Sequence, residues 1–329
     1  MIRRGVRGIA AALTTVVVAM SITIAGAEAA PKNPKPTPTA EPTPTQTTDP
    51  TPTPTASPTP APQPTYVALG DSYAAGVGAG TYLQDASGCY RSLKGYPGLI
   101  ATEKGYALDL QACSGAVTTD VLNKQLTGNL ADASYVTITI GGNDVGFAST
   151  MTTCMGSNES ACLSAVSAAV ADTTDTLPDK LDSVFRAVKT KAPSATIVAT
   201  NYPHLLSPIK PDCSWLTVFT KNEVTAINSG ADTLSATISA AAKRTGIGFA
   251  DVRQPFTGHA VCDSPSWINN ASLATYQSFH PNATGYASGY KPTVAGVLGG
   301  TATGTAATVT TGGTTSSDTT RGTVKLPKD

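Results

Sequence analysis

The sequence has little charge of either sign. Only 13% of its 329 residues are Asp, Glu, Lys or Arg, and 22 basic residues balance 22 acidic ones. No block of Lys and Arg stands out, so the electrostatic footprint of nucleic-acid binding is missing. We therefore predict no nucleic-acid partner, and no other charged partner is implied.

Several cofactor and metal motifs are missing too. The sequence has no G-K-[ST] of a phosphate-binding loop and no C-x-x-C of a zinc knuckle or redox dithiol. The stretch "GDSYAAGVGAG", residues 70–80, places its later glycines at alternate positions, which does not match the G-x-G-x-x-G turn of dinucleotide-binding proteins. We predict neither a cofactor nor a metal.

Both ends of the chain lack the composition of a folded domain. Residues 1–30 join three arginines, an apolar run and "AEA", a pattern typical of a secretory signal peptide, although an uncleaved membrane anchor is the alternative. Residues 31–64 are rich in Pro and Thr, and 299–329 in Gly and Thr, so both are predicted to be disordered. The first could be a tether near a cell wall or merely a solvated tail. We expect an extracellular protein.

Residues 65–298 then form one predicted domain, which contains all six cysteines. An even number of cysteines in an exported chain indicates disulfides, and six allow fifteen connectivities. Cys154 and Cys162 enclose a short polar loop, so we predict that pair first. Sequential pairing of the others predicts Cys89–Cys113 and Cys213–Cys262.

Short β-branched segments alternate with longer segments of helical length. The predicted strands are 66–70, 135–144, 195–203 and 246–252, and the helical segments include 160–191 and 219–244. This alternation predicts a parallel sheet with helices on both faces, and such sheets bind ligands at the carboxyl ends of their strands. The polar residues there are Asp71, Ser72, Asn143, Asp144 and Asn201.

Ser72 follows the first predicted strand at a sharp turn. Its hydroxyl would project from the sheet edge and its amide would lie at a helix N-terminus, as a nucleophile requires; an N-cap serine beside a Gly-rich loop is the structural alternative. A serine hydroxyl is a weak nucleophile until a base takes its proton. Of the three histidines, His280 in "HPNATGY" is the candidate base, while His204 and His259 are interpreted as structural.

An acyl-transfer intermediate also needs donors for its oxyanion. Asn143 in "GGND" offers a side-chain amide, and Gly115 in "ACSGA" offers an unshielded main-chain N–H. Each motif alone would equally suit a turn.

Together "GDSYAAG", "CSGA", "GGND" and "HPNATGY" resemble the four blocks of the SGNH, or GDS(L), hydrolase family. The six-cysteine layout and "GHAVC" resemble its secreted actinobacterial esterases and lipases. The resemblance implies a flavodoxin-like three-layer α/β/α sandwich with a mostly parallel sheet, and ester hydrolysis through an acyl-enzyme. It also implies Ser72 as nucleophile and His280 as base, with an oxyanion hole of the Ser72 and Gly115 amides and the Asn143 side chain.

One position departs from the family pattern. An Asp usually stands three residues before the histidine, and this chain has Gln277 there. We therefore predict a Ser-His dyad in which the Gln277 main-chain carbonyl orients His280, with Asp251 and Asp263 as less favoured orienters.

The substrate stays open between lipid or other small esters and O-acetyl groups of a polysaccharide, and a wall-displayed binding module without activity is the non-enzymatic alternative. Tyr73, Phe147 and Trp267 lie near the motifs and could line an acyl groove or belong to the core. We expect a monomer.

Overall fold

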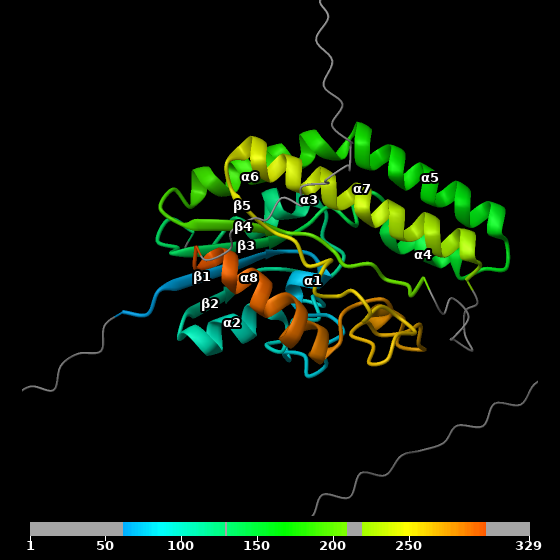
Figure 1. Ribbon diagram of the computed structural model, residues 1–329. Coiled ribbons are helices and arrows are strands. Elements are labelled where there is room, and N and C mark those ends of the chain that lie inside the picture. The colour runs from blue at the N-terminus through cyan, green and yellow to red at the C-terminus, as the bar shows by residue number, and fades with distance from the viewer. Residues whose placement is uncertain (1–61, 129, 209–218, 301–329) are drawn as a thin grey trace, which may run out of the picture. The chain divides into compact units, whose positions relative to one another are not determined.

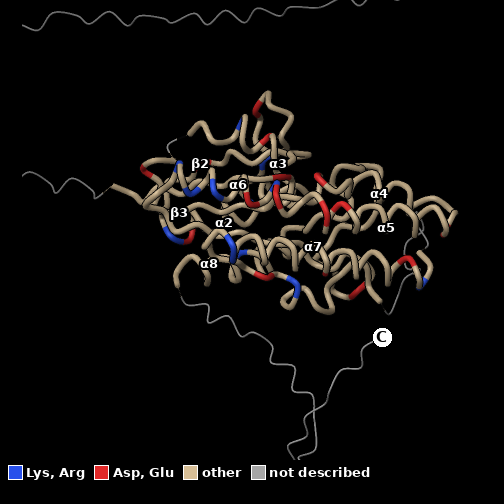
Figure 2. The backbone as a smooth tube through the Cα atoms, turned by 90° about the horizontal axis from the view of Figure 1, so that it is seen from above, with Lys and Arg blue, Asp and Glu red and all other residues tan. Residues whose placement is uncertain are grey.

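The computed structural model describes residues 62–300, apart from 129 and 209–218. The predicted signal peptide, residues 1–30, lies outside the described residues, as do most of the predicted linker and tail. Within the described ranges no helix is long and apolar enough to cross a bilayer. Figure 2 shows charged residues of both signs dispersed along this part of the chain.

The predicted parallel sheet is present. Its strands run in the order β2-β1-β3-β4-β5, and each pairs in parallel with its neighbours. Their bounds are β1 Thr65–Gly70, β2 Ala107–Leu110, β3 Tyr135–Thr139, β4 Thr196–Thr200 and β5 Gly248–Ala250. β2 was not predicted, because "ALDL" is short, carries a charge and is only half-buried. β3 ends at Thr139, which leaves "GGND" as a turn rather than the end of a strand.

Helices cover both faces of the sheet, giving the three predicted layers (Figure 1). On one face lie α2 and α8; on the other lie α6 and α7, with α4 and α5 extending beyond the strands. Their bounds are α2 Tyr96–Lys104, α4 Phe147–Cys154, α5 Glu159–Asp175, α6 Leu177–Lys191, α7 Lys221–Thr245 and α8 Lys291–Leu298. Short helices are α1 Ser72–Ala75, α3 Thr118–Asp120, η1 Val121–Gln125, η2 Thr275–Gln277 and η3 Gly285–Tyr290.

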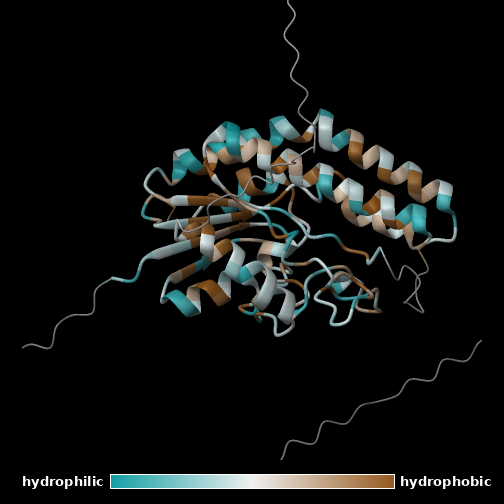
Figure 3. Ribbon diagram, viewed as in Figure 1, coloured by the Kyte–Doolittle hydropathy of each residue, from teal (hydrophilic) through white to brown (hydrophobic). Residues whose placement is uncertain are grey.

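Local sequence explains where the long helices begin and end. The segment 160–191 is two helices, because Pro178 lacks the N–H that a continuous helix needs and stands in the first turn of α6. α7 begins at a capping box between Thr220 and Glu223 and ends at Gly246, whose φ of 66° is the left-handed conformation that glycine adopts without strain. Hydrophobic residues follow the strands between the two helix layers (Figure 3).

Two of the three predicted disulfides are present. Cys89 bonds to Cys113 and Cys154 to Cys162. Cys262 is also disulfide-bonded, and its predicted partner, Cys213, lies outside the described residues.

Candidate active site

Ser72 is held at the turn between β1 and α1. Gly70 has φ +120°, and a Cβ there would lie 2.0 Å from the Thr139 carbonyl oxygen, so only glycine fits. Asp71 is the N-cap of α1 and accepts a hydrogen bond from the Tyr73 N–H at 3.0 Å. Because Asp71 takes the capping role, Ser72 does not have to, and the N-cap alternative for this serine is wrong. The Ser72 N–H stands in the first helical turn, where amides lack a partner within the helix.

The fold brings His280 to this serine. Its Nε2 lies 2.7 Å from the Ser72 Oγ, although the two residues are 208 positions apart. Its Nδ1 lies 3.0 Å from the main-chain carbonyl oxygen of Ser278. A carbonyl oxygen can only accept, so Nδ1 carries the proton and Nε2 is left to accept from the seryl hydroxyl.

The carbonyl that orients His280 is therefore Ser278's, and the prediction of Gln277 is wrong by one residue. The Gln277 carbonyl accepts the His280 main-chain N–H at 3.2 Å, and its side-chain amide donates to the Tyr276 hydroxyl. Phe279 has φ +61°, which turns the chain so that the imidazole faces the carbonyl two residues back. The Tyr73 hydroxyl donates to the Phe279 carbonyl at 2.6 Å and holds this turn.

The imidazole is neutral at neutral pH. Burial lowers the pKa of His280 to about 4, and the main-chain carbonyls of Ser278 and Gln277 act in the opposite direction. Neither aspartate considered as an orienter contacts it. Asp251 pairs with Arg253 at 2.6 Å, and Asp263 accepts the Ala260 N–H at 2.9 Å.

The glycine and asparagine motifs meet beside Ser72. The Asn143 side-chain amide donates to the Ala116 carbonyl at 3.0 Å, which uses one of its two hydrogens and fixes the orientation of the other. Asp144 accepts from both the main-chain N–H and the hydroxyl of Thr118, at 3.0 and 2.6 Å. Gly115 has φ +79°, and among the described residues nothing accepts its N–H.

Sequence reasoning missed two side chains that hold these turns. The Tyr202 hydroxyl donates to Asp71 at 2.5 Å and accepts the Gly142 N–H at 3.0 Å, so it joins the serine turn to the asparagine turn. Burial raises the pKa of the Asp71 carboxyl to about 7, while the Tyr202 hydrogen bond lowers it. Gln125 bonds to both the N–H and the carbonyl of Gly70, at 2.7 and 2.9 Å.

Tyr202 had a signal in the sequence, because it follows β4 at the same edge of the sheet as the other polar residues. Gln125 had none, because it belongs to a short π-helix within an irregular connection.

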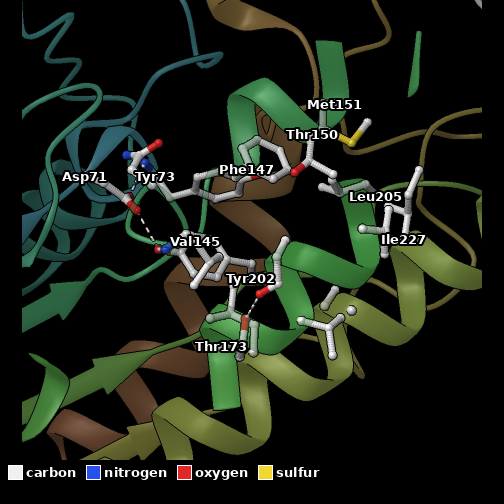
Figure 4. Close-up of a pocket in the computed structure, with 18 of the residues that line it drawn as sticks. Asp71, Tyr73, Val145, Phe147, Thr150, Met151, Thr173, Tyr202, Leu205 and Ile227 are labelled. Carbon is white, nitrogen blue, oxygen red and sulfur yellow. Dashed lines mark hydrogen bonds between the residues drawn. The ribbon is translucent and has the colours of Figure 1, made fainter. Parts of the chain in front are cut away.

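An apolar pocket opens at Ser72 and Asn143 and continues between α4, α5 and α7 (Figure 4). Tyr73 and Phe147, for which the sequence left groove lining and core packing open, line it together with Tyr202. Its aliphatic lining further in comprises Val145, Met151, Val166, Val170, Leu205, Ile227 and Leu234. Trp267 does not line it: its ring stacks on His259 with centroids 3.7 Å apart and packs against the hydrophobic core, which was the other place considered for it. His204 lies away from Ser72 and contacts Asp232 at 2.8 Å.

A seryl oxygen hydrogen-bonded to a neutral imidazole, with amide donors nearby, is the chemistry of a hydrolase that forms an acyl-enzyme. Residues 68–288 match the GDSL-like lipase/acylhydrolase family, and the chain belongs to that family. It is therefore a carboxylic ester hydrolase.

Several relatives come from Streptomyces. The chain is 43% identical over 228 residues to a lipase of Streptomyces rimosus, covering 69% of this chain and 84% of the relative. It is 43% identical over 233 residues to Lipase 1 of Streptomyces coelicolor, covering 70% and 85%. The crystal structure of a phospholipase A1 from Streptomyces albidoflavus aligns with a TM-score of 0.67 and 43% identity, covering 71% of this chain and 98% of that one. The extracellular lipase of S. rimosus aligns with a TM-score of 0.66 and 42% identity, covering 70% and 98%.

Proposed function

We propose that this protein is a secreted lipase-type esterase whose substrates carry a fatty acyl chain. The observation that carries the proposal is the apolar pocket that begins at Ser72 and is lined further in by aliphatic side chains. An acetyl group would leave most of this lining without a ligand, so the pocket favours a fatty chain over the O-acetyl group of a polysaccharide. A binding module would need neither the Ser72–His280 hydrogen bond nor the donors beside it.

Ser72 acts as the nucleophile and His280 as the base. His280 Nε2 takes the proton of the Ser72 hydroxyl while Oγ bonds to the ester carbonyl carbon. The Ser72 and Gly115 amides and the Asn143 side chain donate to the oxyanion. As the tetrahedral intermediate collapses, Nε2 gives its proton to the leaving alkoxide and the acyl group stays on Ser72. Water then attacks the acyl carbon as the same nitrogen takes its proton, and Nε2 returns that proton to the Ser72 oxygen as the fatty acid leaves.

The Ser278 carbonyl keeps the Nδ1 proton in place through this cycle. It supplies a partial charge where a triad would supply a carboxylate, so it stabilises the imidazolium less. The dyad therefore relies on orientation and on the oxyanion donors for most of its effect.

The localisation proposal rests on two observations. The first 30 residues have the pattern of a signal peptide, and a relative of 42% identity is an extracellular lipase.

Hydrolysis of p-nitrophenyl esters from two to sixteen carbons tests the substrate. Each methylene that enters the pocket is worth ~0.8 kcal/mol, so kcat/KM should rise roughly fourfold per methylene until the pocket is full. Acetylated xylan serves as the competing substrate. Higher kcat/KM on the acetate, or on the xylan, than on every longer ester would contradict the proposal.

Gly230 on α7 allows a sharper version of this test. A Cβ there would lie 3.6 Å from Val170 and 3.7 Å from Val166, so the backbone tolerates a side chain that points into the pocket. Gly230→Leu should lower the ratio of long-chain to acetate activity by about tenfold or more, because the leucine side chain fills part of the pocket and excludes methylenes of a long acyl chain. Gly230→Ala is the matched control and should change the ratio little.

A further inference from the structure

Three tyrosines form a cluster at the surface. Tyr90 and Tyr276 stack with ring centroids 4.4 Å apart, and Tyr82 meets both edge-on at 5.8 and 5.9 Å. Tyr90 is 42% exposed and Tyr276 36%, while Leu273, three residues before Tyr276, is 90% exposed. Exposed aromatic rings gathered in this way, with an exposed leucine in the same loop as one of them, indicate a contact site. We call these four residues the tyrosine patch.

The tyrosine patch adjoins the catalytic histidine. The Tyr82 hydroxyl accepts the Gly78 N–H at 3.1 Å, and a Cβ on Gly78 would lie 2.9 Å from the Cβ of His280. Tyr276 belongs to η2, the turn that leads into His280. The apolar pocket extends in a different direction, since among the described residues it takes no lining side chain from 264–290.

In the proposed mechanism, the alcohol and the acyl chain of a lipid ester lie on different sides of Ser72. His280 must donate its proton to the leaving alcohol, so the alcohol lies on the His280 side. The acyl chain lies in the pocket that opens at Ser72. The alcohol of a lipid ester carries the head group and any second chain, which stay in the lipid aggregate, and it leaves the site past His280 toward the tyrosine patch.

The surroundings of His280 are also uncharged. Residues 72–84 and 264–290, which supply three of the four patch residues, contain no Asp, Glu, Lys or Arg. Near Tyr90, the charges of Asp85 and Arg91 pair with each other at 3.2 Å. A surface of tyrosines and leucine without net charge suits the head-group region of a neutral or zwitterionic lipid aggregate, where one end of a tyrosine is apolar and the other wet.

We infer that the tyrosine patch docks the enzyme on an uncharged lipid surface and thereby presents the lipid's ester to Ser72. The inference rests on the proposed lipid substrate, yet docking and hydrolysis can be measured separately. Binding depends on the patch, whereas cleavage depends on Ser72.

The test is co-sedimentation with phosphatidylcholine vesicles, using Ser72→Ala protein recovered from the culture medium so that the vesicles are not consumed. The protein should sediment with the vesicles equally in low and high salt. In the Ser72→Ala background, the further substitutions Tyr90→Ser, Leu273→Ser and Tyr276→Ser should lower the vesicle partition coefficient by about tenfold or more. Tyr106→Ser is the control, because Tyr106 stacks on Tyr135 at the opposite, amino-terminal edge of the strands. Thermal unfolding checks that each variant is folded.

The inference is overturned if Ser72→Ala protein does not sediment with phosphatidylcholine, or if the patch variant sediments as before. It is overturned too if binding requires anionic lipid, or if the same substitutions abolish sedimentation with insoluble xylan instead, since the patch would then be a sugar platform. Vesicle binding by an enzyme whose wild type cleaves only acetyl esters would uphold docking and refute the proposed substrate.

Discussion

His280, the base that we propose, has a neutral carbonyl as its orienting partner and a partly buried ring. Loss of hydration around the ring disfavours the charged imidazolium and lowers the pKa of His280, and a carbonyl offsets this less than a carboxylate would. In the proposed mechanism the imidazole is therefore neutral and able to accept the Ser72 proton, but the imidazolium that forms is less stable.

This arrangement predicts the acid limb of the pH profile. The lowered pKa of His280 means that the neutral base persists well below pH 6.5. We expect kcat/KM on a soluble short-chain ester to be retained from neutral pH to below 6 and to fall as His280 becomes protonated in the acidic range. If kcat/KM fell to half its maximum above pH 6.5, this expectation would be contradicted. If Asp251→Asn or Asp263→Asn then lowered that pH, a carboxylate would be the group that orients His280.

At the scale of elements, the site depends on how loops fit against one another. The glycine-rich loop after α1 and the loop that carries His280 lie so close that a Cβ on Gly78 would be 2.4 Å from the Pro281 carbonyl oxygen. Asn269 joins the same loops, because its side chain donates to the Gly78 carbonyl at 3.0 Å and its N–H to the His280 carbonyl at 2.8 Å.

Two glycines of this loop make a matched pair for testing the fit. Gly78 and Gly80 both have positive φ, so an alanine at either position costs on the order of 1 kcal/mol of backbone strain. Only Gly78 collides with the His280 loop, since nothing lies within 4 Å of a Cβ on Gly80. Gly78→Ala should lower kcat by roughly tenfold to a hundredfold, while Gly80→Ala lowers stability alone. Equal kcat in the two folded variants would refute the account of this contact.

The sequence predicted those parts of the site that obey a general rule. Parallel strands meet at one edge, so the serine and asparagine turns could be placed together without coordinates. The turn after the first strand and the sequence around His280 suggested the nucleophile and base, and the family resemblance supported both. Gln125 and Asn269 could not be found from the sequence, because they support the site through hydrogen bonds to main-chain groups of loops distant in the sequence. The orienting carbonyl was assigned to Gln277 instead of Ser278, because the sequence does not reveal that Phe279 adopts a left-handed conformation.

At the scale of the whole molecule, the disulfides constrain loops of different length. Cys89 and Cys113 are 24 positions apart in the sequence, and Cys154 and Cys162 are 8 apart. Cys113 stands two residues before Gly115, so the longer loop also holds a proposed oxyanion donor.

Replacing each cystine by two serines should therefore have unequal effects. Chain entropy alone makes the longer loop worth about 1 kcal/mol more than the shorter one. Denaturant unfolding should show the larger loss for Cys89→Ser/Cys113→Ser, accompanied by lower kcat. If the Cys154→Ser/Cys162→Ser protein were the less stable of the two, loop entropy would not be the governing term.

Covalent labelling by a p-nitrophenyl alkylphosphonate tests most directly whether Ser72, activated by His280, is the nucleophile. The seryl oxygen displaces p-nitrophenolate and keeps the phosphonyl group, so the label marks the attacking atom. We predict one equivalent of p-nitrophenolate per chain, a single adduct that peptide mapping assigns to Ser72, and a labelling rate reduced on the order of a thousandfold or more in His280→Ala. An adduct on any other residue, or labelling of Ser72→Ala at the rate of the unaltered protein, would contradict the account.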